Sequence, residues 1–210
     1  MVTVGLIDYG MGNMHSVTKA LEKAGSQVVH VHTPEALMQM DRIVLPGVGA
    51  FRDCMAVLQE KGLDEAILER IQAGMPFLGI CLGMQVLMQS SMEFGFYQGL
   101  KVIPGAVKPF PETHPERGFK IPHMGWNDVL LGANHDHPVL STLQGQQVYY
   151  VHSYVCVPDQ SEHILAACSY GDHPFACAIG HDNVLGVQFH PEKSQQAGLN
   201  MLKAFIDWRI

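Results

Sequence analysis

The sequence predicts an α/β fold in which a mostly parallel central sheet carries helices on both faces. In the first half of the chain, short uninterrupted apolar runs alternate with segments whose apolar residues recur at helical spacing. Strands buried on both faces of a parallel sheet have this continuous apolar character. Hydrophobic residues make up 47% of the 210 residues, enough to fill a core without a metal or disulfide. The sequence contains no repeat, low-complexity tract or linker, so we expect one domain over residues 1–210.

The first half supplies the expected parallel strands at residues 2–7, 28–31, 43–45 and 77–80. A helix is predicted between the first two strands, and Gly25 ends it. Two more helices are predicted between the third and fourth strands, and Gly74 and Pro76 end the second of them. The apolar faces of the first and last of these helices consist of Val17, Ala20, Leu21 and Ala24, and of Leu63, Ile67 and Ile71.

The second half has a different pattern, in which short strand-like runs are separated by turn residues. Residues 148–151, 164–167 and 184–189 are predicted strands, and we expect this half to add antiparallel strands to the sheet. Residues 109–118, with three prolines and no apolar rhythm, are predicted to form an exposed loop. A C-terminal amphipathic helix is predicted from the spacing of Leu199, Leu202, Phe205 and Ile206.

The charge and the cysteine content exclude several classes of protein. A net charge of −7, a sequence pI near 5.9 and the lack of a Lys/Arg cluster argue against nucleic acid or an anionic membrane as a partner. No basic signal peptide begins the chain, and no apolar run approaches the roughly 20 residues of a membrane span. Five scattered cysteines do not form a disulfide framework. We therefore expect a soluble, cytoplasmic protein.

Cys81 has the sequence setting of a catalytic nucleophile. Residues 79–83 read Gly-Ile-Cys-Leu-Gly and stand between the strand 77–80 and an apolar stretch, 84–88, that we expect to be helical. This is the form of a nucleophile elbow, in which glycines allow close approach at a sharp strand-to-helix turn. The amides at a helix start favour a thiolate and can donate to a developing oxyanion. The alternative is a small buried cysteine at a tight turn.

The other four cysteines lack this setting, and we predict that they fill the core. Cys54 falls in a helix, and the remaining three fall on or near short strands. Cys168, Cys177 and the intervening His173 could be imagined as zinc ligands. No fourth ligand stands at a suitable spacing, and the His173–Pro174 pair looks like a hairpin turn. We expect neither a metal nor a cofactor.

The segment 184–192 offers the base that a thiol nucleophile needs. On an extended segment, His190 and Glu192 point the same way and can lie side by side. The carboxylate of Glu192 would then fix one ring nitrogen of His190 while the other takes the proton of Cys81. With twelve histidines in the chain, one such pair with a carboxylate is expected by chance. The pair indicates catalysis only because the chain also has the elbow cysteine. His135 and His137 are expected in a polar loop.

Two glycine-containing loops follow predicted strands. Residues 46–49, Pro-Gly-Val-Gly, end the third strand at the sheet edge that also carries the elbow. Their amides could complete an oxyanion hole with the amide of Leu82, although an ordinary strand-to-helix turn would look the same. Gly10-Met11-Gly12 suggests a dinucleotide-binding loop, which we reject because His15 replaces the third glycine and no acidic residue ends the second strand.

These segments together resemble the class I, triad-type glutamine amidotransferases. The resemblance rests on residues 79–85 (Gly-Ile-Cys-Leu-Gly-Met-Gln) and 189–192 (Phe-His-Pro-Glu). Residues 8–13 (Asp-Tyr-Gly-Met-Gly-Asn), 46–49, 122–127 (Pro-His-Met-Gly-Trp-Asn) and 151–154 (Val-His-Ser-Tyr) narrow it to the amidotransferase subunits of imidazole glycerol phosphate synthases. It spans the chain from residue 5 to the C-terminal helix. A flavodoxin-like strand topology is implied.

The resemblance also implies roles for individual residues. Cys81, His190 and Glu192 would hydrolyse L-glutamine, and Val48, Gly49 and Leu82 would form the oxyanion hole, with a peptide flip in the glycine loop as a switch. The glutamine would be held by Gln85 and Glu93 at its α-amino and carboxylate groups, with help from Gly47 and from His152, Ser153 and Tyr154. The partner would be a (β/α)8 barrel cyclase in a heterodimer. Asn13, Met124, Trp126 and Lys193 would face it.

Two other functions fit much of the same sequence. One is another class I amidotransferase subunit, or a cysteine hydrolase of the same broad fold, which the acceptor partner would distinguish. The other is a non-catalytic docking subunit, against which the retained triad argues.

Overall fold

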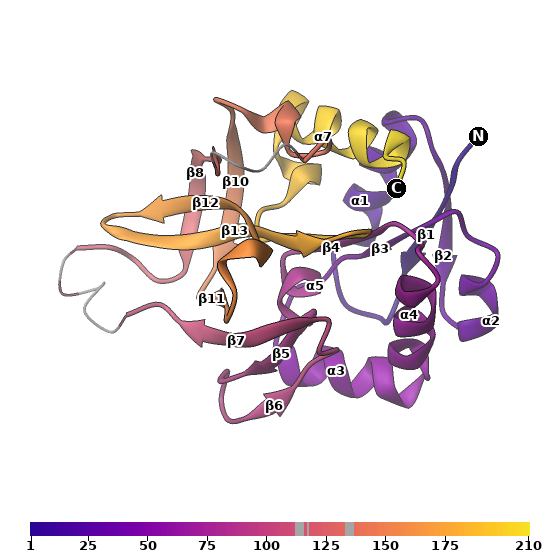
Figure 1. The fold of residues 1–210 in the computed structure, drawn as a ribbon, viewed down its shortest axis with the longest axis horizontal. Helices are drawn as coiled ribbons and strands as arrows, with labels where there is room; N and C mark the ends of the chain where they lie inside the picture. The colour runs from indigo at the N-terminus through magenta and orange to yellow at the C-terminus, as the bar shows by residue number, and fades with distance from the viewer. Residues whose placement is uncertain (112–115, 117, 133–136) are drawn as a thin grey trace.

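The computed structural model describes residues 1–111, 116, 118–132 and 137–210, and its main feature is a twelve-stranded sheet with helices on both faces (Figure 1). The strands are β1 (Thr3–Ile7), β2 (Gln27–Val31), β3 (Arg42–Leu45), β4 (Phe77–Ile80), β5 (Met88–Ser91), β6 (Tyr97–Gln98), β7 (Ile103–Pro109), β8 (His123–Asp128), β9 (Leu130–Leu131), β10 (Gln147–His152), β11 (Tyr154–Pro158), β12 (Ile164–Tyr170), β13 (His173–His181) and β14 (Val184–Val187). The helices are α1 (Met14–Lys23), α2 (Pro34–Leu37), α3 (Phe51–Glu60), α4 (Leu63–Gln72), α5 (Leu82–Gln85) and α7 (Gln195–Asp207), with 3-10 turns η1 (Ser141–Leu143), η2 (Ser161–His163) and η3 (Pro191–Lys193).

Five neighbouring strands, in the order β2-β1-β3-β4-β14, run parallel and form the core of the sheet. Strands β13, β11 and β7 extend it in antiparallel fashion, and β5 and β6 complete that edge. Strands β8 and β10 form a separate antiparallel pair. The predicted α/β fold, mostly parallel at its centre with antiparallel additions in the C-terminal half, is confirmed.

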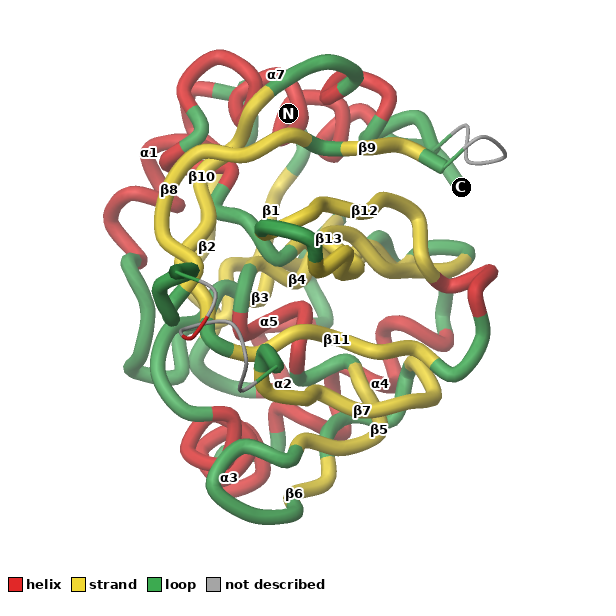
Figure 2. Tube along the Cα trace, turned by 90° about the vertical axis from the view of Figure 1, so that its left-hand side faces the viewer, coloured by secondary structure: helices red, strands yellow, loops and turns green. Residues whose placement is uncertain are grey.

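The two faces of the sheet bury separate cores, and Figures 1 and 2 show from two directions the helices that cover these faces. Within β3, Val44 packs in the cluster that contains the apolar faces of α1 and α7. Its neighbours Ile43 and Leu45 pack in the cluster that contains α2, α3 and α4. Successive side chains of a strand point to opposite faces, so a strand covered on both sides must be apolar throughout.

The apolar stretch after the elbow is not the helix that we expected. Helix α5 ends at Gln85, and the chain enters strand β5 at Met88. The carbonyl groups of Val86 and Leu87 accept from the amides of Leu100 and Ile103, at 2.8 and 3.0 Å. Tertiary pairing therefore overrides the local pattern, which was ambiguous because an apolar run buried on all sides fits either a helix or a strand.

Two smaller expectations also change. The hairpin between β12 and β13 turns at Gly171 and Asp172, so His173 and Pro174 begin the returning strand. Half of the loop predicted at 109–118, namely residues 112–115 and 117, lies outside the described residues, as does His135, whereas Pro109 belongs to β7. His137 lies with its ring 4.8 Å from that of Trp208. Among the described helices, none has the length and apolar character needed to cross a bilayer.

Asn183 joins α4 to the centre of the sheet. Its buried Nδ2 donates to the carbonyl oxygens of Ile71 and Met75, both at 2.8 Å. Its own carbonyl oxygen accepts from the amide of Phe77 at 2.9 Å. One side chain therefore satisfies two carbonyl groups at the end of α4 beside the start of β4, the strand that leads to Cys81.

We predict that Asn183→Ala destabilises the fold by about 1–3 kcal/mol, because the carbonyl group of Met75 loses its side-chain donor and that of Ile71 keeps only the amide of Gly74. The free energy of unfolding, measured by urea titration, tests this. Asn200→Ala, on the exposed face of α7, is the matched control and should change it by less than about 0.5 kcal/mol. Equal stabilities for the two variants would show that Asn183 has no such bracing role.

Candidate active site

Cys81 stands at a strained turn between β4 and α5. Its dihedral angles are φ 55° and ψ −108°, which few residues with a side chain adopt. The amide of Cys81 donates to Val187 of β14 at 2.8 Å, and its carbonyl oxygen accepts from Met84 at 3.0 Å. The residue is thus fixed on one side by the sheet and on the other by the first turn of α5.

The flanking glycines are required by close packing. A Cβ atom at Gly83 would collide with the carbonyl oxygen of Leu45 in β3, and a Cβ at Gly79 would collide with the carbonyl oxygen of Gly83. Any side chain at these positions would push the turn away from the neighbouring strand. The predicted nucleophile elbow is therefore present, with the glycine roles that its sequence suggested.

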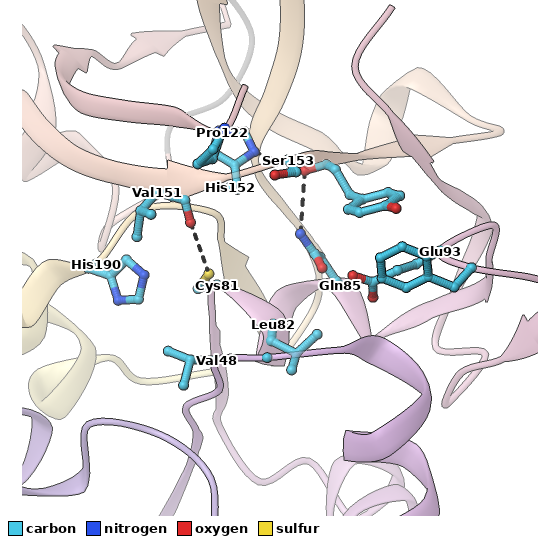
Figure 3. Close-up of a pocket in the computed structure, with 13 residues that line it drawn as sticks. Val48, Cys81, Leu82, Gln85, Glu93, Pro122, Val151, His152, Ser153 and His190 are labelled. Atoms are coloured by element: carbon cyan, nitrogen blue, oxygen red, sulfur yellow. Dashed lines mark hydrogen bonds between the residues drawn. The ribbon is translucent and has the colours of Figure 1, made fainter. Parts of the chain in front are cut away.

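His190 and Glu192 form the expected pair. The Nδ1 atom of His190 lies 2.8 Å from Oε1 of Glu192, and the two side chains are 4% and 1% exposed. Figure 3 shows the His190 ring beside Cys81 at the same end of the pocket. Among the described residues, Nε2 of His190 is buried without a hydrogen-bond partner. Because Nδ1 of His190 donates its proton to Glu192, Nε2 is the ring nitrogen that can exchange a proton with Cys81.

The local geometry of this pair differs from our expectation. Residues Pro191–Lys193 form the 3-10 turn η3, so Glu192 folds back toward His190 instead of lying beside it on an extended strand. Ser194, which was not predicted to belong to the site, holds the turn in place. Its Oγ donates to the carbonyl oxygen of His190 at 2.7 Å and accepts from the amide of Tyr149 in β10 at 3.0 Å.

The surroundings of His190 favour its protonated form. Burial alone lowers the pKa of the ring, but the nearby Cys81 and the hydrogen-bonded Glu192 outweigh it and raise the pKa to about 10. A protonated imidazole beside a cysteine is the arrangement that activates a thiol as a nucleophile. In contrast, burial raises the pKa of Cys54 to about 12 and of Cys168 to about 11, which keeps these two as thiols.

The predicted core role of the other cysteines is confirmed. Cys54, Cys156, Cys168 and Cys177 are each at most 2% exposed. They lie in α3, β11, β12 and β13, with their side chains in the two hydrophobic clusters. Cys81 is thus the one cysteine of the chain that lines the cavity described next.

Cys81 opens into a cavity of about 410 Å³ (Figure 3). Its lining consists of Val48, Gly49, Cys81, Leu82, Gln85, Glu93, Phe94, Pro122, Val151, His152, Ser153, Tyr154 and His190. Segments from both halves of the chain meet here, at the carboxyl ends of β3 and β4, where open α/β sheets bind ligands. Phe94, Pro122 and Val151 had not been predicted as site residues. Phe94 follows β5, whose strand character was itself missed.

One predicted substrate contact, Gly47, does not line the cavity. It lies beneath the loop, where an added Cβ would come within 2.5 Å of the Tyr9 hydroxyl and 2.8 Å of Leu82 Cβ. Glycine is therefore needed there for close packing. Gly49, which does line the cavity, has φ 100°, a conformation that favours glycine, and Val48 beside it is 43% exposed. The first-turn amide of Leu82, at the start of α5, has no acceptor within the helix.

Glu93 links the cavity to the helix that follows the glycine loop. Its Oε2 accepts from the amide of Phe51, the first residue of α3, at 2.6 Å. A carboxylate at a helix start is stabilised by the helix dipole, so this residue has a structural role besides the predicted contact with glutamine. Tyr154 lines the same cavity, and burial together with the charge of Glu93 raises the pKa of the tyrosine.

His152 is held by a chain of hydrogen bonds behind the cavity wall. Its Nδ1 lies 2.8 Å from the carbonyl oxygen of Tyr154, and its Nε2 lies 3.0 Å from Nδ1 of His123 in β8. Burial lowers the pKa of His152 to about 3 and that of His123 to about 4, so both rings are neutral. A neutral His152 must then donate from Nδ1, and His123 must donate to its Nε2.

The residues predicted to face a partner lie near the surface. Met124 is 62% exposed and Trp126 43% exposed, two positions apart on β8. Lys193 has its Nζ 5.6 Å from the centre of the Tyr149 ring. Asn13 caps α1, since its side chain accepts from the amide of Ser16 at 3.3 Å, so it has a local structural role. Their contact with a partner stays a prediction.

Comparison with known proteins assigns the family. The sequence model of "Glutamine amidotransferase class-I" matches residues 5–208, nearly the whole chain. The chain belongs to the class I glutamine amidotransferase family. The predicted resemblance is therefore confirmed, and the elbow, base and glycine loop lie where such an amidotransferase needs them.

The most similar curated relatives carry one name. A protein of Geobacter sulfurreducens named "Imidazole glycerol phosphate synthase subunit HisH" is 50% identical over 208 residues, which cover 98% of each chain. A protein of the same name from Acinetobacter baylyi is 46% identical over the full length of both chains. Solved structures of more distant sequence share the fold. A structure described as "Structure of PurLQS from Thermotoga maritima" has a TM-score of 0.75 at 17% identity over 98% of each chain. Another, "Crystal structure of glutamine amidotransferase", has a TM-score of 0.72 at 18% identity, covering 96% of this chain and 98% of that one.

The Glu192–His190 bond leads to the first prediction about activity. Glu192→Gln keeps the shape of the carboxylate but removes the charge that stabilises the imidazolium. We expect kcat for glutamine hydrolysis to fall by about 10²–10⁴-fold, with KM changed by less than about threefold. Steady-state kinetics measure both. The exposed Glu65→Gln on α4 is the control and should match the unmodified chain, and a near-normal rate in Glu192→Gln would mean that another group orients His190.

Proposed function

We propose that this amidotransferase hydrolyses L-glutamine to glutamate and ammonia and passes the ammonia to a cyclase subunit that makes imidazole glycerol phosphate in histidine biosynthesis. The observation that carries the proposal is that Cys81 and His190 line one cavity, with Glu192 bonded to His190 behind it, in a chain of the class I glutamine amidotransferase family. The shared name of relatives at 50% and 46% identity supports the cyclase reaction in particular.

Hydrolysis proceeds in two stages through a thioester. The Cys81 thiolate attacks the γ-carboxamide carbon of glutamine, and the carbonyl oxygen becomes an oxyanion that the Leu82 amide and the 48–49 loop stabilise. The imidazolium of His190 gives its proton to the amide nitrogen, so the C–N bond breaks and ammonia leaves. Water then attacks the thioester while His190 takes a proton from it. Glutamate is released, and the thiolate–imidazolium pair is restored.

The rest of the cavity positions glutamine for this attack. Glu93 and Gln85 bind the α-amino end, and the backbone of residues 152–154 lies along the opposite wall. A cavity of about 410 Å³ suits a small amino acid in extended form. These groups leave only the carboxamide end of glutamine directed at Cys81, which makes the reaction selective for the side chain over the backbone.

The partner that receives the ammonia is a cyclase of the (β/α)8 barrel type, bound in a heterodimer to a single 1–210 domain in the cytoplasm. The exposed Met124 and Trp126 of β8 and the nearby Lys193 form the contact surface. Strand β8 pairs with β10 through six residues, and β10 leads directly into the cavity wall at His152. Contact at β8 is therefore one strand away from the glutamine.

We predict that Cys81→Ala lowers glutamine hydrolysis by at least about 10⁴-fold, because no other group can form the thioester. The complex of this variant with the cyclase should still make product from added ammonium salt at the rate of the unmodified complex. Cys54→Ala, which removes a buried cysteine of α3, is the control and should retain glutamine hydrolysis. Retained hydrolysis in Cys81→Ala would refute the proposed nucleophile.

A second prediction concerns the glycine loop. One oxyanion donor is worth about 2.7–4 kcal/mol in the transition state, or about 10²–10³ in rate. If rotation of a loop peptide at Gly49 presents this donor only in the complex, the free chain is a poor glutaminase whose glutamine affinity is little changed. Gly49→Pro removes the amide and should reduce the rate of the complex by that factor. Equal turnover of the free chain and of the complex with its nucleotide substrate would show that no such switch exists.

A further inference from the structure

Gln188 is a buried polar residue between two functional segments, directly after β14 and two positions before His190. It is 0% exposed, so it does not line the cavity itself. The main-chain amide of Gln188 donates to the carbonyl oxygen of Cys177 at 2.9 Å. Its side chain points from β14 toward Cys81, the same direction that His190 takes two residues later, in keeping with the alternation of an extended segment.

The side chain of Gln188 connects the nucleophile to Gln85. Its Nε2 lies 3.7 Å from Sγ of Cys81, within the range of a hydrogen bond to sulfur. Its Oε1 lies 3.0 Å from Nε2 of Gln85. The same Nε2 of Gln85 lies 3.4 Å from the carbonyl oxygen of Tyr154, which Figure 3 draws as a dashed line.

The direction of every bond in this chain follows from its one fixed end. The carbonyl oxygen of Tyr154 can only accept, so the Gln85 atom that faces it must be the NH₂ group. That group also faces Gln188, which must therefore present its oxygen. The NH₂ group of Gln188 is then left for the sulfur of Cys81, and a thiolate accepts such a donor well. Reversal of either amide would place two donors or two acceptors against each other.

We infer that Gln188 is a further residue of the active site, which donates to the Cys81 thiolate and fixes the Gln85 amide so that its oxygen faces the α-ammonium group of glutamine. Only the role in orienting the Gln85 amide rests on the proposed glutamine hydrolysis; the contact with Cys81 does not. Oε1 of Gln85 accepts no hydrogen bond from the described residues and belongs to a side chain that lines the cavity. With Glu93 across from it, an ammonium group would find two acceptors.

Gln188→Met and Gln188→Glu separate the two roles. Methionine is of similar length and removes both hydrogen bonds. Glutamate keeps an oxygen that accepts from Gln85, but it cannot donate to sulfur and adds a negative charge beside Cys81. Gln89→Met, at an exposed position of β5, is the control for the loss of an amide. The folded state of each variant is checked by circular dichroism and thermal unfolding.

The first measurement is the pH profile for alkylation of Cys81 by iodoacetamide, followed by peptide mass. The midpoint should move to higher pH by about one unit in Gln188→Met, since a hydrogen bond to a charged group is lost, and further in Gln188→Glu. The other ionisable groups near Cys81 are unchanged in both variants; they are His190, Glu192, Glu93, Tyr9 and Cys156. A midpoint unmoved in both variants would overturn the contact with sulfur. This readout does not depend on glutamine hydrolysis.

The second measurement compares glutamine with 4-carbamoylbutanoate, which lacks only the α-amino group, as substrates of the complex with the cyclase. The ratio of the two kcat/KM values should fall roughly ten- to hundredfold in Gln188→Met, because the Gln85 amide can then turn its NH₂ group to the ammonium. In Gln188→Glu the ratio should stay near that of the unmodified complex, although both rates fall. An unchanged ratio in folded Gln188→Met, or an equal loss of ratio in both variants, would overturn the role in amide orientation. If the unmodified complex hydrolysed neither substrate, the proposed function would fail while the alkylation result still tested the bond to sulfur.

Discussion

The strained backbone of Cys81 is the constraint on which the site depends. A side-chain-bearing residue at φ 55° costs on the order of 1–3 kcal/mol, so its surroundings must impose it. They do so through the ladder bond to Val187 and through glycine contacts that leave no room for a Cβ at position 79 or 83. Relaxation of the turn would separate α5 from β3. The sharp turn brings the thiol out of the sheet and places the Leu82 amide next to it.

The pairing of β4 with β14 also brings the other catalytic residues to Cys81. Because β14 pairs in parallel with β4, the residues that follow β14 emerge at the same edge as Cys81. Gln188 and His190 therefore approach the thiol from one strand, and η3 turns Glu192 back to hold the ring. Ser194 ties this turn to β10, whose partner β8 carries the exposed Met124 and Trp126. A short path of hydrogen bonds through the Ser194 hydroxyl thus joins a surface strand to the catalytic base.

Much of this arrangement could be predicted because it depends on local pattern. The parallel strands and the elbow glycines, for example, follow from apolar runs and from the steric needs of a sharp turn. Gly47, by contrast, was expected to contact glutamine but lies beneath the loop against Tyr9, a packing relation that no spacing reveals. The expected helix over 84–88 ends where strand β5 begins, and β5 could not be predicted because its partner β7 lies more than ten residues later in the chain. Ser194 and Phe94 were missed because their roles arise only when distant segments meet.

The central claim is that the elbow makes Cys81, among five cysteines, the single nucleophile that faces the glutamine cavity. A diazoketone analogue of glutamine tests it most directly, since it alkylates the thiolate that it meets in a glutamine site. The complex with the cyclase is incubated with the analogue, digested and mapped by peptide mass, with and without excess glutamine. We expect one modified residue, Cys81, and protection by glutamine. Modification of Cys54, Cys156, Cys168 or Cys177 instead, or modification of Cys81 that glutamine does not prevent, would contradict it.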